Sequence, residues 1–237
     1  RVSLGAHTAL AALRIADGAS SRIAALDRKL GQRFVAVDPV RPHAALVEQY
    51  NSGAYRLSRV NADGSREDLY EGKKLEEFLL DQSGQLNFIR TLDAAYNQVV
   101  ERKTGGKWQE AARCKRLRAC GLVSASGDQR RLTMLVNHEE DRKALVEIDL
   151  DKQTRKVLHT DPGMLSDLRT VVLSPDSQQP MFVVYDMPQR RIYGLTPAAK
   201  RAAGDIAKRF PESNISIGAS EAAPRWLLTE RGARLSQ

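Results

Sequence analysis

The chain repeats itself with a period in the mid-forties, and this repeat constrains the fold more than any other feature. A polar residue that opens a turn recurs at Asp38, Asp81, Ser126, Ser174 and Ser220, with spacings of 43, 45, 48 and 46 residues. A short apolar run follows each of these turns. Periods of roughly 20–50 residues are typical of proteins that stack one structural unit on the next.

The clearest copy of the unit lies at residues 122–158. It contains four short apolar runs, at 122–125, 132–136, 144–150 and 155–158, separated by turn-forming sequences. Short runs rich in Val, Ile and Leu between turn formers predict the strands of an antiparallel meander. Because one small sheet cannot bury both of its faces alone, a repeated four-stranded sheet predicts a β-propeller.

The repeat predicts an all-β fold of about five to six four-stranded antiparallel blades, incomplete at both ends. Residues 1–237 are interpreted as a single β-propeller domain or a fragment of one. The expected blades are 1–33 (partial), 34–72, 75–112, 119–160, 166–210 and 213–237 (partial). The first blade is expected to hold one or two strands, with 23–26 as its third-strand position, and the chain is expected to come from a longer protein.

The strand pattern breaks near residues 197–210, where one inserted helix is predicted. Thr196 is a plausible cap, and Pro197 stands at the first helical position. Apolar side chains at helical spacing are Ala199, Ala202, Ala203, Ile206 and Phe210. We expect this amphipathic helix to replace or follow the hairpin of the fourth strand and to pack on the rim; binding to a partner is the weaker alternative.

The net charge of +8, from 37 Lys and Arg against 29 Asp and Glu, raises a nucleic-acid interpretation. The basic residues alternate with acids, and no basic stripe is interleaved with stacking aromatics, so a solvated basic surface is favoured. No apolar run approaches the roughly 20 residues that span a bilayer. The chain begins at Arg1 with no leader, so a signal peptide is expected to be removed or never included, and periplasm and cytoplasm both stay open.

Two cysteines, Cys114 and Cys120, lie where one blade passes to the next. Their spacing is not that of a zinc site, and no second pair completes four ligands. A short-loop disulfide in an oxidising compartment stays open. Two free thiols are favoured.

The titratable residues do not predict a catalytic, metal or cofactor site, and we name none. His138, Glu139 and Glu140 lack the second histidine of a zinc-peptidase helix, so a solvated hairpin loop is favoured. Asp149 and Asp151 fit a turn in which carboxylates accept backbone hydrogen bonds. The remaining residues considered, each given a structural role without a partner in sequence, are His7, His43, His159, Ser124 and Ser126.

Three segments, 122–137, 171–186 and 197–217, resemble the propeller domain of bacterial prolyl oligopeptidase-type serine peptidases. In that family a Ser-Pro-Asp-Gly turn joins the first two strands of each blade, and Ser174-Pro175-Asp176 keeps three of the four residues, with Ser177 in place of Gly. The end of the family's long Ala-rich helix is echoed in Lys208-Arg209-Phe210-Pro211. The resemblance covers about residues 22–229.

The resemblance implies an α/β-hydrolase catalytic domain in the same polypeptide, with a propeller that covers the active site and filters peptide substrates by size. This chain has no Gly-x-Ser-x-Gly nucleophile elbow; the nearest sequence is residues 218–222, which lacks the second Gly. We therefore expect a non-catalytic propeller of a serine peptidase. The alternative is a stand-alone propeller that binds protein or a ligand, and either form is expected to self-associate through open blade edges.

Overall fold

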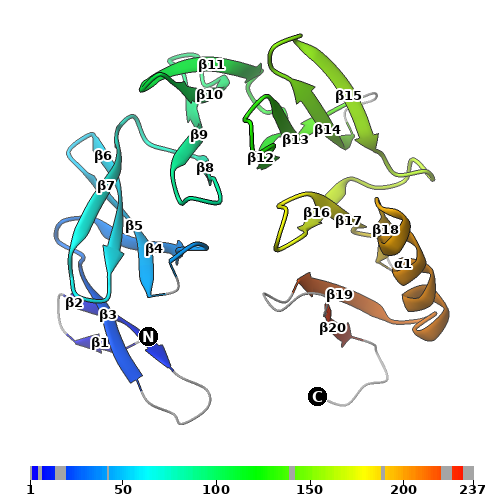
Figure 1. Ribbon diagram of the computed structural model, residues 1–237, viewed down its shortest axis with the longest axis horizontal. Coiled ribbons are helices and arrows are strands. Elements are labelled where there is room, and N and C mark those ends of the chain that lie inside the picture. The colour runs from blue at the N-terminus through cyan, green and yellow to red at the C-terminus, as the bar shows by residue number, and fades with distance from the viewer. Residues whose placement is uncertain are drawn as a thin grey trace. The chain divides into compact units, whose positions relative to one another are not determined.

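The computed structural model describes residues 2–4, 7–13, 20–41, 43–138, 142–187, 190–219 and 226–231. The chain forms two compact units, Arg1–Arg113 and Cys114–Gln237. Within the described residues the regular structure consists of strands β1 to β20 and the single helix α1 (Figure 1).

The first unit contains one three-stranded sheet, β1-β2-β3, and two four-stranded sheets, β4-β5-β6-β7 and β8-β9-β10-β11. The strands are β1 Val2–Leu4, β2 His7–Leu13, β3 Ser20–Asp27, β4 Gln32–Val37, β5 Ala44–Asn51, β6 Ala54–Asn61, β7 Arg66–Gly72, β8 Glu77–Leu80, β9 Leu86–Leu92, β10 Gln98–Thr104 and β11 Lys107–Cys114. The first blade was expected to hold one or two strands; the structure describes three, because the Ala-rich run at β2 pairs with both β1 and β3.

The second unit contains a four-stranded sheet β12-β13-β14-β15, a three-stranded sheet β16-β17-β18 and a pair β19-β20. Its elements are β12 Cys120–Ala125, β13 Arg131–Asn137, β14 Lys143–Asp149, β15 Thr154–His159, β16 Leu168–Leu173, β17 Pro180–Tyr185, β18 Arg191–Gly194, α1 Pro197–Arg209, β19 Asn214–Ala219 and β20 Trp226–Arg231. The predicted all-β fold of four-stranded antiparallel sheets with one helix is confirmed. The assignment of the whole chain to one propeller domain stays a prediction.

Neighbouring sheets bury apolar side chains against each other within each unit. In the first unit, Leu46 of β5 shares a cluster with Leu86 and Ile89 of β9. In the second, Leu145 of β14 shares a cluster with Val183 of β17. Fully burying one such side chain contributes roughly 1.5–3 kcal/mol. Central strands are therefore apolar on both faces, whereas the outer strands β7 and β15 are mostly exposed.

The polar residue that marks the sequence repeat caps the turn after the first strand. Asp38 Oδ1 accepts the N–H groups of Val40 and Arg41, at 2.8 and 2.9 Å. Asp81 Oδ1 accepts the N–H of Ser83 in the next blade, and Ser126 Oγ accepts that of Arg131. The repeat thus reflects a backbone requirement that recurs in each blade; Ser220 lies outside the described residues.

A buried arginine joins two blades of the first unit. The side chain of Arg59 on β6 is 1% exposed and forms an ion pair with fully buried Asp38. Its Nη2 donates to the Gly84 carbonyl at 2.5 Å, and its Nη1 donates to Glu67 at 2.7 Å. Gly84 has a φ of +80°, and a Cβ there would lie 2.8 Å from Arg59 Nη2, so glycine is required at this turn.

The charged state of Asp38 is stabilised by these contacts. Burial alone would raise the pKa of the Asp38 carboxyl, but hydrogen bonds from Arg59 and from two backbone N–H groups hold it below its ordinary value of 3.8. A lowered carboxyl pKa stabilises the fold above the ordinary value, and this stabilisation is lost as pH falls through the folded-state pKa. The Arg59–Asp38 pair therefore stabilises the fold at neutral pH, and this stabilisation is lost in acid.

Helix α1 takes the chain position of a fourth strand after β18. Thr196 Oγ1 accepts the N–H of Ala199 at 3.2 Å, and proline stands at the start of the helix, as the sequence predicts. A Cβ at Gly194 would lie 2.1 Å from the Ala199 carbonyl carbon, so glycine allows the helix to sit directly on β18. Buried Ala199 and Ala203 then pack against Phe182.

The expectation of two free thiols is wrong, because Cys114 and Cys120 form a disulfide. Cys114 ends β11 and Cys120 begins β12, and a turn closed by the N–H of Arg118 and the carbonyl of Lys115 lies between them. This turn brings the two Cα atoms to 5.9 Å, a separation that a disulfide spans.

We predict that Arg59→Ala lowers the free energy of unfolding by about 3–5 kcal/mol, because it leaves a buried carboxylate without its cation. Arg56→Ala on the same strand is the matched control; Arg56 is exposed and pairs with Asp68 and Glu71. The control substitution should lower the free energy of unfolding by no more than ~1 kcal/mol. Urea unfolding of both variants at pH 7 measures the difference, and equal losses would refute the role given to Arg59.

Candidate functional site

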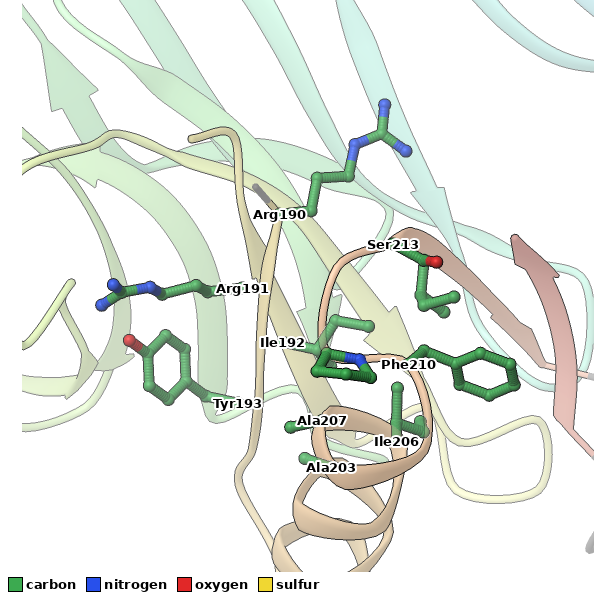
Figure 2. A pocket seen from close by; sticks show the side chains of 11 residues that line it. Arg190, Arg191, Ile192, Tyr193, Ala203, Ile206, Ala207, Phe210 and Ser213 are labelled. Atoms are coloured by element: carbon green, nitrogen blue, oxygen red, sulfur yellow. The ribbon is translucent and has the colours of Figure 1, made fainter. Parts of the chain in front are cut away.

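Two cavities lie beside β18 and α1 in the second unit. The first has a volume of about 320 Å³ and is shown in Figure 2. The second has a volume of about 540 Å³ and extends toward the end of β15. Both are lined by Ile192, Tyr193, Ala203 and Ala207, and we name this shared region the α1–β18 groove.

Helix α1 and β18 border both cavities. Figure 2 shows the Arg191 and Tyr193 side chains on one side of β18 and Ile192 on the other, beside the helix. The helix side is apolar, and its lining includes Ile192, Ala203, Ile206, Ala207 and Phe210. The larger cavity is also bordered by α1, through Lys200 and Gly204, and its lining includes His159 and Tyr193.

One edge of β18 has hydrogen-bonding groups that its sheet does not use. The Leu195 N–H donates to the Met181 carbonyl, so odd-numbered residues of β18 bond to β17. The N–H and C=O of Ile192 therefore point away from β17. On the same edge, the Arg190 N–H donates to the Asn214 side chain at 2.8 Å. Ile192 has no such partner among the described residues.

His159 stands at the end of β15 within an aromatic cluster. Its Nδ1 lies 2.8 Å from the Tyr185 hydroxyl, and its ring centroid lies 5.1 Å from that of Tyr193. Burial lowers the pKa of the imidazole; the charge of Asp161 opposes this effect, and that of Lys200 adds to it. Burial also raises the pKa of the Tyr185 hydroxyl. The cluster therefore favours a neutral imidazole.

Asp161 is a buried anion two residues after His159. It is 4% exposed, and its carboxylate accepts the N–H groups of Gly163, Leu165 and Ser166 at 2.8–3.2 Å. Burial would raise its pKa, but these backbone hydrogen bonds outweigh burial and lower it. Both oxygens are engaged in ordering the loop after β15.

The basic side chains at the groove differ in their partners. Arg190 donates to Ser216 Oγ at 2.6 Å and lies 3.6 Å from Asp186. Arg191 and Lys200 are exposed, and no described acidic oxygen lies within 4 Å of either. The positive charge of Arg191 helps to lower the pKa of the buried Asp161 carboxyl.

The other residues singled out in the sequence do not line either cavity. Asp149 Oδ1 accepts the N–H groups of Asp151 and Lys152 at 3.1 and 2.9 Å, which confirms the predicted turn. Ser124 lies buried in β12, and Ser126 caps the next turn. His7 lies in β2, His43 stands in a turn, and the His138 N–H donates to the Arg142 carbonyl. Glu139 and Glu140 lie outside the described residues.

The sequence analysis missed the residues that meet His159. Tyr185 and Tyr193 come from adjacent strands of the following blade, so no local spacing links them to His159. The only sequence pattern that could have indicated this contact is that these residues lie at equivalent strand ends of successive blades.

The described residues contain neither a metal-binding cluster nor a membrane-spanning helix. No group of three His, Cys, Asp or Glu side chains gathers there in a way that could hold a metal ion. No helix in the described part of the chain is long and apolar enough to cross a membrane.

Comparison with solved structures establishes the fold class. TolB from Acinetobacter baumannii superposes with a TM-score of 0.55 at 9% identity, over 94% of this chain and 57% of that one. A protein described as TolB from Agrobacterium tumefaciens gives 0.54 at 13% identity, over 95% and 78%. The chain has a β-propeller-type fold. Sequence identities this low support a shared fold but not a shared function.

The chain spans only 53% of another neighbour, an uncharacterized protein from Listeria monocytogenes, with 10% identity and a TM-score of 0.42. No protein-family profile matches the sequence. No curated protein matches it either. The resemblance to prolyl oligopeptidase-type propellers is not confirmed by these comparisons.

We predict that His159 titrates below the ordinary histidine pKa of 6.5. A lowered histidine pKa means that the unfolded chain binds the proton more readily, so the cluster loses stability as pH falls below about 6.5. Lys200→Gln should raise the pKa of His159, because it removes a nearby positive charge. Lys208→Gln on the same helix is the control and should leave it unchanged. NMR titration of the imidazole measures all three proteins, and a His159 pKa at or above 6.5 would refute this description.

Proposed function

We propose that this chain is a non-catalytic β-propeller module that binds peptide segments, as the propeller domain of a prolyl oligopeptidase-like serine peptidase. In that role it covers the active site of an α/β-hydrolase domain of the same polypeptide and filters peptide substrates. The observation that supports peptide binding most directly is the α1–β18 groove, where apolar side chains of α1 and β18 lie beside Arg190, Arg191 and Lys200.

A binding role fits the chemistry of this chain better than acyl transfer. Nucleophilic catalysis needs a serine held against a base that a third group orients. The sequence contains no Gly-x-Ser-x-Gly elbow. The histidine beside the groove has its Nδ1 next to the Tyr185 hydroxyl, and its pKa is lowered mainly by burial. The contact of His159 on β15 with Tyr185 on β17 therefore stabilises the packing of two neighbouring blades.

The peptidase assignment is supported by sequence features. The Ser174 turn joins the first two strands of its blade as in the resembled family, and the Ala-rich helix follows β18 at the expected place. The assignment requires a catalytic domain elsewhere in the polypeptide. Gene sequence adjoining this segment tests it, because a Gly-x-Ser-x-Gly hydrolase domain would support it.

A stand-alone propeller that binds protein or a ligand is the second candidate. It is favoured by the same groove, since an apolar groove beside a helix suits a segment from another protein as well as a substrate. A gene that encodes propeller blades and no hydrolase domain would favour this candidate.

We predict that a fluorophosphonate probe does not label the purified chain, because the sequence contains no Gly-x-Ser-x-Gly elbow that would position a nucleophile. An active serine hydrolase treated in parallel is the positive control. Ser220 stands in the sequence closest to an elbow, so Ser220→Ala and Ser126→Ala are the informative pair. Labelling of the parent chain that Ser220→Ala abolishes and Ser126→Ala preserves would contradict the non-catalytic assignment.

A further inference from the structure

We infer that the larger cavity of the α1–β18 groove binds the C-terminal residue of a peptide, with polar side chains holding the terminal carboxylate and the rest of the cavity holding an apolar side chain. The inference rests on the proposed peptide-binding function and specifies which part of the peptide this cavity takes. It is carried by the three polar residues that line the cavity, the apolar character of its other lining residues and the charge beside it.

The larger cavity combines a few polar side chains with a mostly apolar lining. Its three polar lining residues come from three different elements: His159 ends β15, Tyr193 lies on β18 and Lys200 lies on α1. The other lining residues are glycine or apolar, and they include Leu158, Ile192, Leu195 and Ala203. The volume of about 540 Å³ falls within the roughly 300–1,000 Å³ that is usual for a small-ligand site, and such sites are mostly apolar with a few polar groups.

The polar side chains at this cavity can all donate hydrogen bonds. The Tyr185 hydroxyl is fully buried beside His159 Nδ1, and burial raises its pKa, so it stays protonated and donates to that nitrogen. A neutral imidazole that accepts at Nδ1 carries its proton on Nε2. The Tyr193 hydroxyl and the Lys200 ammonium have no hydrogen-bond partner among the described residues. Donors of this kind, one of them charged, suit a carboxylate.

The charge beside the cavity also favours an anion. None of the described residues that line this cavity is acidic. The negative charge that acts on His159 comes from Asp161, whose carboxylate is engaged by three backbone N–H groups. The positive charge of Arg191 acts on Asp161 in turn and offsets it. Lys200 on α1 therefore leaves the cavity with an excess of positive charge.

The apolar lining distinguishes a peptide terminus from an acidic side chain within a peptide. An internal Asp or Glu would bring the polar amides on both sides of it toward apolar residues such as Leu158 and Leu195. Polar amides removed from water without partners are costly. A C-terminal residue instead carries its carboxylate on the same carbon atom as its side chain, so an apolar last residue matches both kinds of lining.

The experiment uses the full chain and the peptide Gly-Ser-Gly-Ala-Leu, labelled with fluorescein at its N-terminus, with binding followed by fluorescence anisotropy at pH 8. We expect the peptide with a free C-terminus to bind saturably, and the same peptide with a C-terminal amide to bind about 10-fold more weakly or worse. Replacing the last residue by Ser should also weaken binding. Unlabelled 4-methylpentanoate distinguishes a free acid from a peptide; if it displaced the peptide at equal concentration, the cavity would be a site for small acids and the inference would be overturned.

Four variants test the location of the carboxylate. Lys200→Gln should weaken binding of the free-acid peptide about fivefold or more, and Tyr193→Phe about threefold or more, while each leaves the amide peptide within about twofold. Lys208→Gln is the matched control for charge, on an exposed position of α1 that lines neither cavity. Tyr50→Phe, on exposed Tyr50 of β5 in the first unit, is the control for the hydroxyl. Both controls should leave the affinity for either peptide within about twofold.

The imidazole NMR signals of His159 distinguish binding in this cavity from charge attraction elsewhere. The free-acid peptide should shift these signals, because Nε2–H gains an acceptor. Binding that leaves His159 unshifted, or that Lys208→Gln weakens as much as Lys200→Gln, would overturn the inference. Equal binding of the acid and amide peptides would refute the inference and leave the proposed peptide-binding function intact. Absence of binding by both peptides would refute that function as well.

Discussion

Burial of one small sheet against the next is the interaction on which this structure depends. A two-faced sheet of three or four short strands cannot shelter its apolar residues alone. In each unit the residues that face a neighbouring element are therefore among the least exposed ones, such as Leu57 and Ile89 in the first unit and Leu145 and Phe182 in the second. The turns and the buried ion pair hold the sheets in the positions that these contacts require.

The recurring turn residues and the buried Arg59 serve that packing. A carboxylate or hydroxyl at the start of each turn satisfies backbone N–H groups where the first strand ends. Arg59 adds a contact that spans two blades, since it reaches both Asp38 and the Gly84 carbonyl. Buried ion pairs offer specificity more readily than net stability. We interpret Arg59 as a device that fixes how these two blades meet.

Much of the fold could be predicted from the sequence, because turn chemistry and apolar runs are local. The strands of the central blades and the capped start of α1 follow from residues within a few positions of one another. The contacts that were missed all join distant positions: Arg59 with Gly84, and His159 with Tyr185. The disulfide was misjudged for a related reason, since the separation of 5.9 Å between its Cα atoms depends on how two strands leave their turn.

The candidate site could not be predicted because it depends on where α1 lies relative to β18. The sequence correctly indicated a helix after β18, yet a helix that replaces a strand and a helix that follows one look alike in sequence. The cavity linings show that α1 lies beside the outer edge of β18, because Ala203 and Ala207 border both cavities next to Ile192 and Tyr193. Function in this chain is therefore inferred from the cavities between β18 and the helix that takes the place of a fourth strand.

The central claim is that β18 is the last strand of its sheet in the described part of the chain, so that α1 and not a further strand lies beside its outer edge. Native-state hydrogen exchange of the free chain, measured residue by residue by NMR, tests it most directly. The account predicts alternation along β18, with protected amides at Arg191 and Tyr193, which bond to β17, and a rapidly exchanging amide at Ile192. Protection of Ile192 equal to that of Tyr193 would show that a further strand already pairs with the edge and would contradict the account.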